Sequence, residues 1–142
     1  MKAKKKFGQN FLVDRYFISQ IIKEINPKIG DNILEIGPGK GAITDPILKK
    51  INHISVVEID PDMIKILKNK ISPINISILA EDILNMNNEF FEKFNKIIGN
   101  LPYYIATEII LKLTKIYSSP SELYFMVQKE VAERITAKPS NK

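Results

Sequence analysis

The sequence predicts an α/β fold in which helices cover both faces of a doubly wound, mostly parallel sheet. Short apolar runs alternate along the chain with longer stretches of helical periodicity. The short runs are largely apolar throughout, as expected of strands that are buried on both faces. Glycine, acidic and Asn-x-Pro motifs follow these runs. Because open parallel sheets bind ligands at the carboxyl ends of their strands, the motifs and the fold support one another.

The first predicted element is a helix that Asp14 caps. Apolar residues at helical spacing follow, and Asn26-Pro27 ends the pattern. Pro61 suits the first turn of a later helix, with Asp60 as its N-cap. Strands are expected at residues 32–36, 54–59, 76–80, 96–98 and 123–127. Further helices are expected over 42–50, from Pro61 to Ile71, from Ile105 to Leu113 and over 129–137.

Length and composition favour one globular domain. The chain has 142 residues, of which 44% are hydrophobic and 26% are charged. It has no cysteine and one histidine, His53, so we expect neither a disulfide nor a metal site. We divide it into a basic arm over 1–13 and a domain over 14–142. With no bilayer-spanning run and no signal-peptide core, we expect a cytoplasmic protein. The net charge of +5 favours a polyanionic partner only weakly.

A glycine-dense loop, Gly37-Pro-Gly-Lys-Gly41, follows the first predicted strand. Glycines allow a tight turn and the close approach of a ligand to the backbone. Amides at the start of the next helix can bind a carboxylate. The spacing is G-x-G-x-G, whereas dinucleotide-binding loops carry G-x-G-x-x-G, so the loop favours a ligand without a pyrophosphate. A plain strand-to-helix turn is the alternative interpretation.

Acidic residues follow the next two predicted strands. Glu58 ends the second strand, where a carboxylate can accept hydrogen bonds from both hydroxyls of a ribose. Asp82 follows the third strand and can accept from the exocyclic amine of an adenine, with Ile59 and Ile83 against the ring. The alternatives are a surface or helix-capping carboxylate at Glu58 and an exposed turn carboxylate at Asp82.

The motif Asn100-Leu-Pro-Tyr103 closes the fourth predicted strand and suits methylation of adenine. The exocyclic nitrogen of adenine is a poor nucleophile because its lone pair is delocalised into the ring. The Asn100 amide oxygen and the Leu101 carbonyl, whose direction Pro102 restricts, can accept its N–H groups and favour tetrahedral geometry. Tyr103 can stack on a base taken out of its helix. A sulfonium methyl donor is already activated, so alignment supplies much of the catalysis. The alternative is a turn that opens a helix, with Tyr103 in the core.

The segment Phe7-Gly-Gln-Asn-Phe-Leu12 is unusual before a helix. Its two aromatic side chains can cover a ligand, and its amides can reach it. A hydrophobic staple onto the first helix is the alternative interpretation.

Six segments together resemble the kasugamycin-sensitivity dimethyltransferase family in order and spacing. The resemblance covers nearly the whole chain and implies a Rossmann-like, class I S-adenosylmethionine-dependent methyltransferase. Members of this family dimethylate two adjacent adenosines near the 3′ end of small-subunit ribosomal RNA, and some assist ribosome assembly. The segments are Lys5–Leu12, Leu34–Thr44, Val57–Asp60, Glu81-Asp82, Gly99–Ile105 and Met126–Arg134.

The resemblance also implies roles for individual residues. Asn10 and Leu12 would contact the S-adenosylmethionine from the arm. Gly37 would lie under its methionine part, Glu58 would bind its ribose, and Asp82 would bind its adenine amine. The residues between cofactor and target base would be Asn100, followed by Leu101, Pro102 and Tyr103.

A sibling family, which methylates large-subunit RNA, shares this plan. It usually has Ile at the position of Leu101 and no proline in the glycine loop, so Leu101 and Pro38 favour the small-subunit group. Lys40 and Ala106 depart from the apolar and hydroxyl residues that often occupy their positions, and we regard both as tolerable variation.

The end of the chain departs more seriously from the family pattern. Ser140-Asn-Lys142 stops where that pattern continues. We expect about five strands, fewer than such a sheet normally has, and no C-terminal helical domain. We therefore expect a truncated chain whose last strand forms an open edge.

The leading hypothesis is a monomeric ribosomal RNA adenine N6,N6-dimethyltransferase that acts on small-subunit RNA or on the immature small subunit. A non-catalytic RNA-binding or ribosome-assembly module that keeps the cofactor fold is one alternative, and a large-subunit methyltransferase is another. A nicotinamide-dependent oxidoreductase ranks last because the glycine spacing is wrong and no hydride-transfer site is visible.

Overall fold

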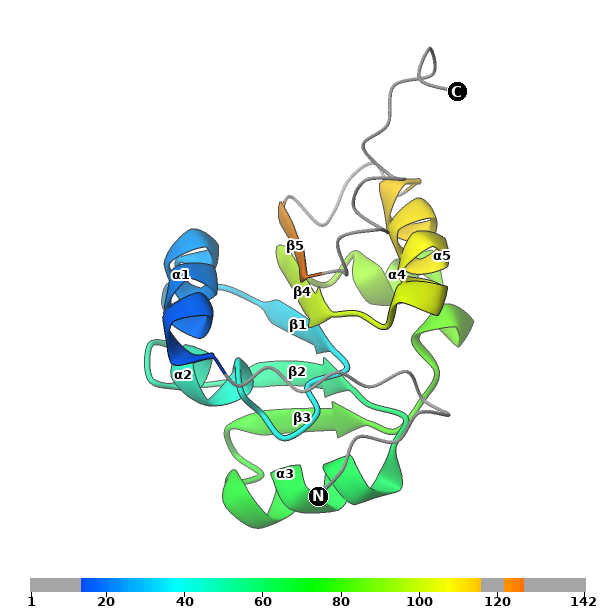
Figure 1. The fold of residues 1–142 in the computed structure, drawn as a ribbon. Helices are drawn as coiled ribbons and strands as arrows, with labels where there is room; N and C mark the ends of the chain where they lie inside the picture. Colours follow the sequence, from blue (N-terminus) through cyan, green and yellow to red (C-terminus); the bar gives the residue numbers. More distant parts are fainter. Residues whose placement is uncertain (1–13, 116–121, 127–142) are drawn as a thin grey trace.

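The computed structural model describes residues 14–115 and 122–126 of the chain. Its elements alternate between strand and helix in the predicted order (Figure 1). The strands are β1 (Ile33–Ile36), β2 (Ile54–Val57), β3 (Ile76–Leu79), β4 (Lys96–Asn100) and β5 (Glu122–Met126). The helices are α1 (Arg15–Ile25), α2 (Thr44–Leu48), α3 (Pro61–Lys70), α4 (Asn88–Phe91) and α5 (Tyr103–Thr114), with a 3₁₀ turn, η2 (Ile83–Asn85). The helix expected over 129–137 lies outside the described residues.

The five strands form one parallel sheet in the order β3-β2-β1-β4-β5. The chain builds outward from β1 to β3 and then returns to the other side of β1 with β4. The direction of winding therefore reverses between β1 and β4, which is where doubly wound sheets open a crevice at their carboxyl ends. The predicted fold class is confirmed for the described residues.

Helices cover both faces of the sheet (Figure 1). One apolar cluster joins α1, α2 and α3 to one face, and it includes Ile33, Val56 and Ile98. A second cluster joins α4 and α5 to the opposite face and includes Leu34 and Ile97. Neighbouring strand residues thus enter different clusters, which explains why the predicted strands are apolar without alternation.

Two predicted helix caps are confirmed. The Asp14 side chain accepts a hydrogen bond from the Phe17 amide at 3.1 Å. Asp60 accepts from the Asp62 amide at 2.9 Å, with Pro61 in the first turn of α3. Both carboxylates satisfy helix-start amides that have no partner within the helix.

Several element boundaries differ from those expected. The helix expected over 42–50 is regular only from Thr44 to Leu48, because turns that begin in the glycine loop occupy the preceding residues. β2 ends at Val57 because the Glu58 side chain accepts hydrogen bonds from the next two amides and turns the chain. β4 continues through Asn100 because its last two residues pair with β5. The short elements η2 and α4 were not predicted.

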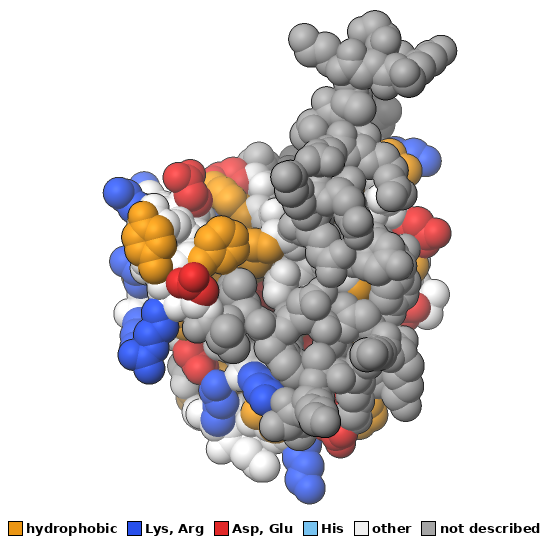
Figure 2. All heavy atoms as spheres, viewed as in Figure 1, with side chains coloured by type: hydrophobic (Ala, Val, Ile, Leu, Met, Phe, Trp, Pro, Cys, Tyr) orange, Lys and Arg blue, Asp and Glu red, His pale blue; other side chains and the backbone are white. Residues whose placement is uncertain are grey.

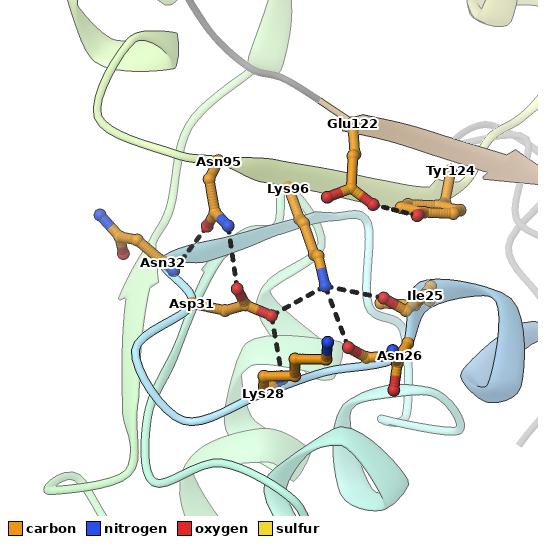
Figure 3. Close-up of polar contacts among 9 residues, drawn as sticks. All are labelled: Ile25, Asn26, Lys28, Asp31, Asn32, Asn95, Lys96, Glu122 and Tyr124. Carbon is orange, nitrogen blue, oxygen red and sulfur yellow. Dashed lines mark hydrogen bonds and ion pairs between the residues drawn. The ribbon is translucent and has the colours of Figure 1, made fainter.

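A buried lysine at the amino end of β4 joins α1 to the sheet (Figure 3). The Lys96 Nζ donates to the carbonyls of Ile25 at 2.8 Å and Asn26 at 3.0 Å, which end α1. It also forms an ion pair of 2.8 Å with Asp31. Burial acts to raise the pKa of Asp31, but hydrogen bonds from Lys96, Asn95 and the Lys28 amide hold it below its ordinary value. This network fixes α1 against the sheet.

Within residues 14–115 and 122–126, no helix is both long enough and apolar enough to cross a bilayer.

Candidate active site

Four of the predicted motifs meet at the carboxyl ends of neighbouring strands. Ile36 is in register with Val57 on one side and with Gly99 on the other, and Val57 is in register with Leu79. The residues that follow these positions therefore leave the sheet at one edge. They are Gly37 after β1, Glu58 after β2, Asp82 a few residues after β3, and Asn100 at the end of β4.

The glycine loop adopts backbone conformations that favour glycine. Gly37, Gly39 and Gly41 have φ angles of 64°, 58° and 90°, which are strained for residues with a Cβ. The Gly37 amide donates to the Val57 carbonyl at 2.9 Å, so the loop starts in fixed register with β2. Among the residues that the structure describes, none would have an atom within 4 Å of a Cβ on Gly37. Within the described part of the chain, the loop thus leaves open space above its first glycine, as an approaching ligand requires.

Glu58 is buried and lies under this loop. Its Oε1 accepts from the Gly39 amide at 3.1 Å, and its Oε2 accepts from the amides of Ile59 at 2.9 Å and Asp60 at 3.0 Å. Burial raises the pKa of Glu58, although these three amides act to lower it by favouring the ionised form. A carboxylate has about four acceptor positions. Three of these positions are occupied by the amides, so one acceptor position remains for a ligand. Displacement of the Gly39 amide would free a second position.

Glu35 is a second buried carboxylate, and it was not singled out from the sequence. It lies within β1 and accepts a hydrogen bond from the hydroxyl of Thr44, at the start of α2. This contact ties together the two ends of the glycine loop. Burial raises the pKa of Glu35 to about 7, the Thr44 hydrogen bond acts against that rise, and the charges of Glu58 and Asp45 add to it. The sequence feature that could have indicated this buried carboxylate is a single acidic residue inside an apolar run.

Asp82 caps the 3₁₀ turn η2. Its Oδ1 accepts from the Leu84 amide at 3.0 Å, so Asp82 has the turn role of the alternative interpretation, although it is half-buried and not exposed. The residues proposed to flank an adenine differ in exposure. Ile59 is 48% exposed and Ile83 is 5% exposed, because Ile83 packs into the core cluster beneath α5. Of the two, only Ile59 has a large accessible apolar surface.

The Asn-Leu-Pro-Tyr motif joins β4 to α5. Asn100 is half-buried, and Leu101 is 2% exposed with its amide donating to the Met126 carbonyl at 3.0 Å. Pro102 has an extended ψ of 138°, and α5 begins at Tyr103. The expected turn geometry is therefore present. The Tyr103 side chain lies outside the part of the structure that is described, as do Asn10 and Leu12.

Gly99 permits the close contact between β1 and β4 beside the site. A Cβ on Gly99 would lie 2.9 Å from the Ile36 carbonyl oxygen and 3.0 Å from the Leu101 Cδ2. The contact with the Ile36 carbonyl oxygen is too short for any other residue unless the backbone moves, and the Leu101 side chain would also have to shift. The sequence analysis placed Gly99 at the end of a strand and in a segment that resembles the family, but it did not predict this close contact.

Solved structures share this arrangement. A dimethyladenosine transferase from Plasmodium falciparum superposes with a TM-score of 0.77 at 28% identity, covering 93% of this chain and 49% of that chain. The 23S rRNA methyltransferase ErmE superposes with a TM-score of 0.71 at 27% identity, covering 89% and 51%. The fold and the strand-end motifs define a Rossmann-like methyltransferase domain.

Sequence relatives narrow this class. The sequence model of one protein family matches residues 1–142, and that family is described as "Ribosomal RNA adenine dimethylase". The ribosomal RNA small subunit methyltransferase A of Dechloromonas aromatica is 41% identical over 139 residues, which are 98% of this chain and 54% of that protein. The chain belongs to the ribosomal RNA adenine dimethylase family. It spans about half the length of the curated relatives that it matches.

Proposed function

We propose that this chain is the cofactor-binding part of an S-adenosylmethionine-dependent ribosomal RNA adenine N6,N6-dimethyltransferase. The observation that carries the proposal is the convergence of Gly37, Glu58, Asp82 and Asn100 at one edge of the sheet, beside the point where its winding reverses. The names of the relatives support small-subunit RNA as the substrate. The target is two adjacent adenosines near the 3′ end of that RNA.

The cofactor site fits the chemistry of S-adenosylmethionine. The open space at Gly37 accommodates the methionine part, and the remaining acceptor position of Glu58 accepts a ribose hydroxyl. Asp82 accepts the adenine amine, with the exposed Ile59 against the ring. Asn10 and Leu12 complete the site from the arm. When bound, S-adenosylmethionine supplies a methyl group already activated by its sulfonium.

The substrate site is formed by the end of β4. The Asn100 amide oxygen and the Leu101 carbonyl accept the N–H groups of the target adenine, and Pro102 fixes the turn between them and α5. Tyr103 stacks on the extruded base. These contacts localise the lone pair on the exocyclic nitrogen and align it with the methyl group.

The proposed partner is small-subunit ribosomal RNA within the immature subunit, which would give the protein a role in ribosomal RNA processing and subunit assembly. We further propose that it acts as a monomer in the cytoplasm. Figure 2 shows Lys and Arg side chains along one side of the molecule. The last turns of α1 and α3 carry lysines, which are Lys23, Lys68 and Lys70. Exposed cations of this kind favour a polyanionic partner.

The substitution Asn100→Ala tests the proposal. We expect methyl transfer to immature small-subunit RNA to fall at least about 100-fold, since an acceptor used in the transition state is lost. Affinity for S-adenosylhomocysteine, measured by calorimetric titration, should change much less. Asn88→Ala, on the exposed start of α4, is the matched control.

Equal methylation by the Asn100→Ala and Asn88→Ala variants would contradict the catalytic assignment of Asn100. Binding of S-adenosylhomocysteine by an unmodified chain that transfers no methyl group would favour the non-catalytic assembly module, unless a longer protein that contains this chain restores methyl transfer.

A further inference from the structure

The turn that carries Asp82 is short and depends on tertiary contacts. η2 spans three residues, Ile83–Asn85, between β3 and α4. Such a turn has few internal hydrogen bonds, so it does not hold its own position. Within the turn, the Asn85 amide donates to the Asp82 carbonyl at 3.0 Å, and the Met86 amide donates to the Ile83 carbonyl at 3.2 Å. The direction of the Asp82 carboxylate therefore depends on what holds η2.

A lysine from α5 holds this turn by a polar contact. The Lys112 Nζ donates to the Leu84 carbonyl oxygen at 2.9 Å in a partly buried position. Leu84 also supplies the amide that donates to the Asp82 carboxylate at 3.0 Å. Lys112 thus acts on the residue whose backbone contacts Asp82.

The rest of α5 fixes where Lys112 lies. Ile109 and Leu113, one on each side of it along the helix, are each 1% exposed. They pack in the apolar cluster that also contains Ile83, with Leu84 at its margin. Because both elements share this cluster, the lysine crosses a fixed gap between α5 and η2.

We propose that Lys112 is a positioning residue for recognition of the cofactor's adenine. This inference rests on the proposed function, in which Asp82 accepts the adenine amine. Lys112 holds the Leu84 carbonyl, and through it the Leu84 amide that orients the Asp82 carboxylate. The same helix begins at the substrate motif, so α5 borders both the cofactor site and the target base.

The choice between adenine and hypoxanthine tests this role. Adenine presents an amine donor to Asp82, whereas hypoxanthine presents a carbonyl oxygen, which a carboxylate repels. The measured quantity is the ratio of the affinities for S-adenosylhomocysteine and S-inosylhomocysteine, by calorimetric titration. A loss of general stability lowers both affinities and leaves this ratio unchanged.

We expect Asp82→Ala to lower the ratio about tenfold, because a charge-assisted hydrogen bond is lost. Lys112→Met should lower it about threefold, the effect of one ordinary hydrogen bond. Lys112→Arg, which keeps a donor, should preserve the ratio. Lys115→Met is the matched control, since it removes a nearby exposed charge from the end of the same helix and should also preserve the ratio.

An unchanged ratio in Lys112→Met, together with a lowered ratio in Asp82→Ala, would overturn the role of Lys112 alone. An unchanged ratio in Asp82→Ala would instead overturn the assignment of the adenine amine to Asp82, and the role of Lys112 with it. An equal decrease in Lys115→Met would also overturn the proposal. If circular dichroism shows that the Met variant is unfolded, Lys112→Gln replaces it, because its side chain is too short to reach the same carbonyl.

Discussion

Glu35 and Glu58 place two acidic side chains under the glycine loop, where little water reaches them. Different hydrogen bonds offset the cost of burying each carboxylate. Glu58 accepts three backbone amides, whereas Glu35 accepts the Thr44 hydroxyl. A charged carboxylate needs strong donors when buried. The weaker compensation at Glu35 explains why burial raises its pKa to about 7.

The substitution Glu35→Gln should therefore change stability in a pH-dependent way. The folded-state pKa is above the ordinary value of 4.5, so the contribution of Glu35 is full below about pH 4.5 and is lost as the pH rises through about 7. We expect the Gln variant to match the unmodified protein at pH 4.5 and to exceed its free energy of unfolding by as much as about 3 kcal/mol at pH 8.

Urea unfolding at both pH values measures this difference. Glu92→Gln, at an exposed position, is the control and should show no such pH dependence. A difference that is the same at pH 4.5 and pH 8 would contradict the titration of Glu35 in this range.

Residue by residue, the sequence predicted the motifs better than their surroundings. Gly37, Glu58, Asp82 and Asn100 lie at strand ends, as expected, because local spacing determines which residue follows a strand. The contact of Gly99 with Ile36 could not be predicted from the sequence, because it depends on which strands are neighbours in the sheet. How these residues bind their ligands remains a prediction.

Among the elements, α1 depends on β4 through Lys96. The ammonium satisfies two carbonyls at the end of the helix and pairs with Asp31, and its side chain is 6% exposed. Desolvation makes such a pair a small net contributor, but removing one partner leaves the other charge buried. The contact therefore matters most when it is broken.

We expect Lys96→Met to lower the free energy of unfolding by about 3 kcal/mol, because Asp31 loses its cation and two carbonyls lose their donor. Denaturant unfolding measures the loss. Lys93→Met, at an exposed position in the same region, should cost less than about 0.5 kcal/mol. Adding Asp31→Asn to Lys96→Met should restore part of the loss. Equal losses of unfolding free energy in Lys96→Met and Lys93→Met would show that the network contributes nothing to stability.

The ends of several helices and strands are determined by local hydrogen bonds and turns, which hydrophobic patterns in the sequence do not predict. β2 stops where Glu58 binds the following amides, and α2 is shortened by the turns of the glycine loop. The two unpredicted elements, η2 and α4, are too short to show a helical period, and each starts at a capping side chain, Asp82 or Asn87.

At the scale of the whole molecule, cofactor binding should stabilise the fold. A ligand that binds only the folded state at 100 times its Kd adds about 2.7 kcal/mol. We expect S-adenosylhomocysteine at that excess to raise the melting temperature by about 10 °C. A nicotinamide dinucleotide at the same concentration should not. Stabilisation by the dinucleotide alone would overturn the cofactor assignment and favour an oxidoreductase.

The alternation of strands and helices predicted the parallel sheet, but it did not establish the strand order. That order follows from handed crossovers and from the packing of each helix on a particular face. Periodicity did not identify the protein family, whereas the resemblance of the motifs did. The match of the family model over residues 1–142 confirms that resemblance.

The strand order has a consequence during synthesis of the protein. β1, at the centre of the sheet, is made early, and β2 and β3, which lie on one side of it, are made next. The partner for its other edge, β4, begins only at Lys96 and arrives seconds later at roughly 5–20 residues per second. During that interval the nascent chain presents an apolar strand with unpaired backbone groups. Because unpaired strand edges can pair with other chains, we expect the nascent chain to need protection from aggregation until β4 has been made.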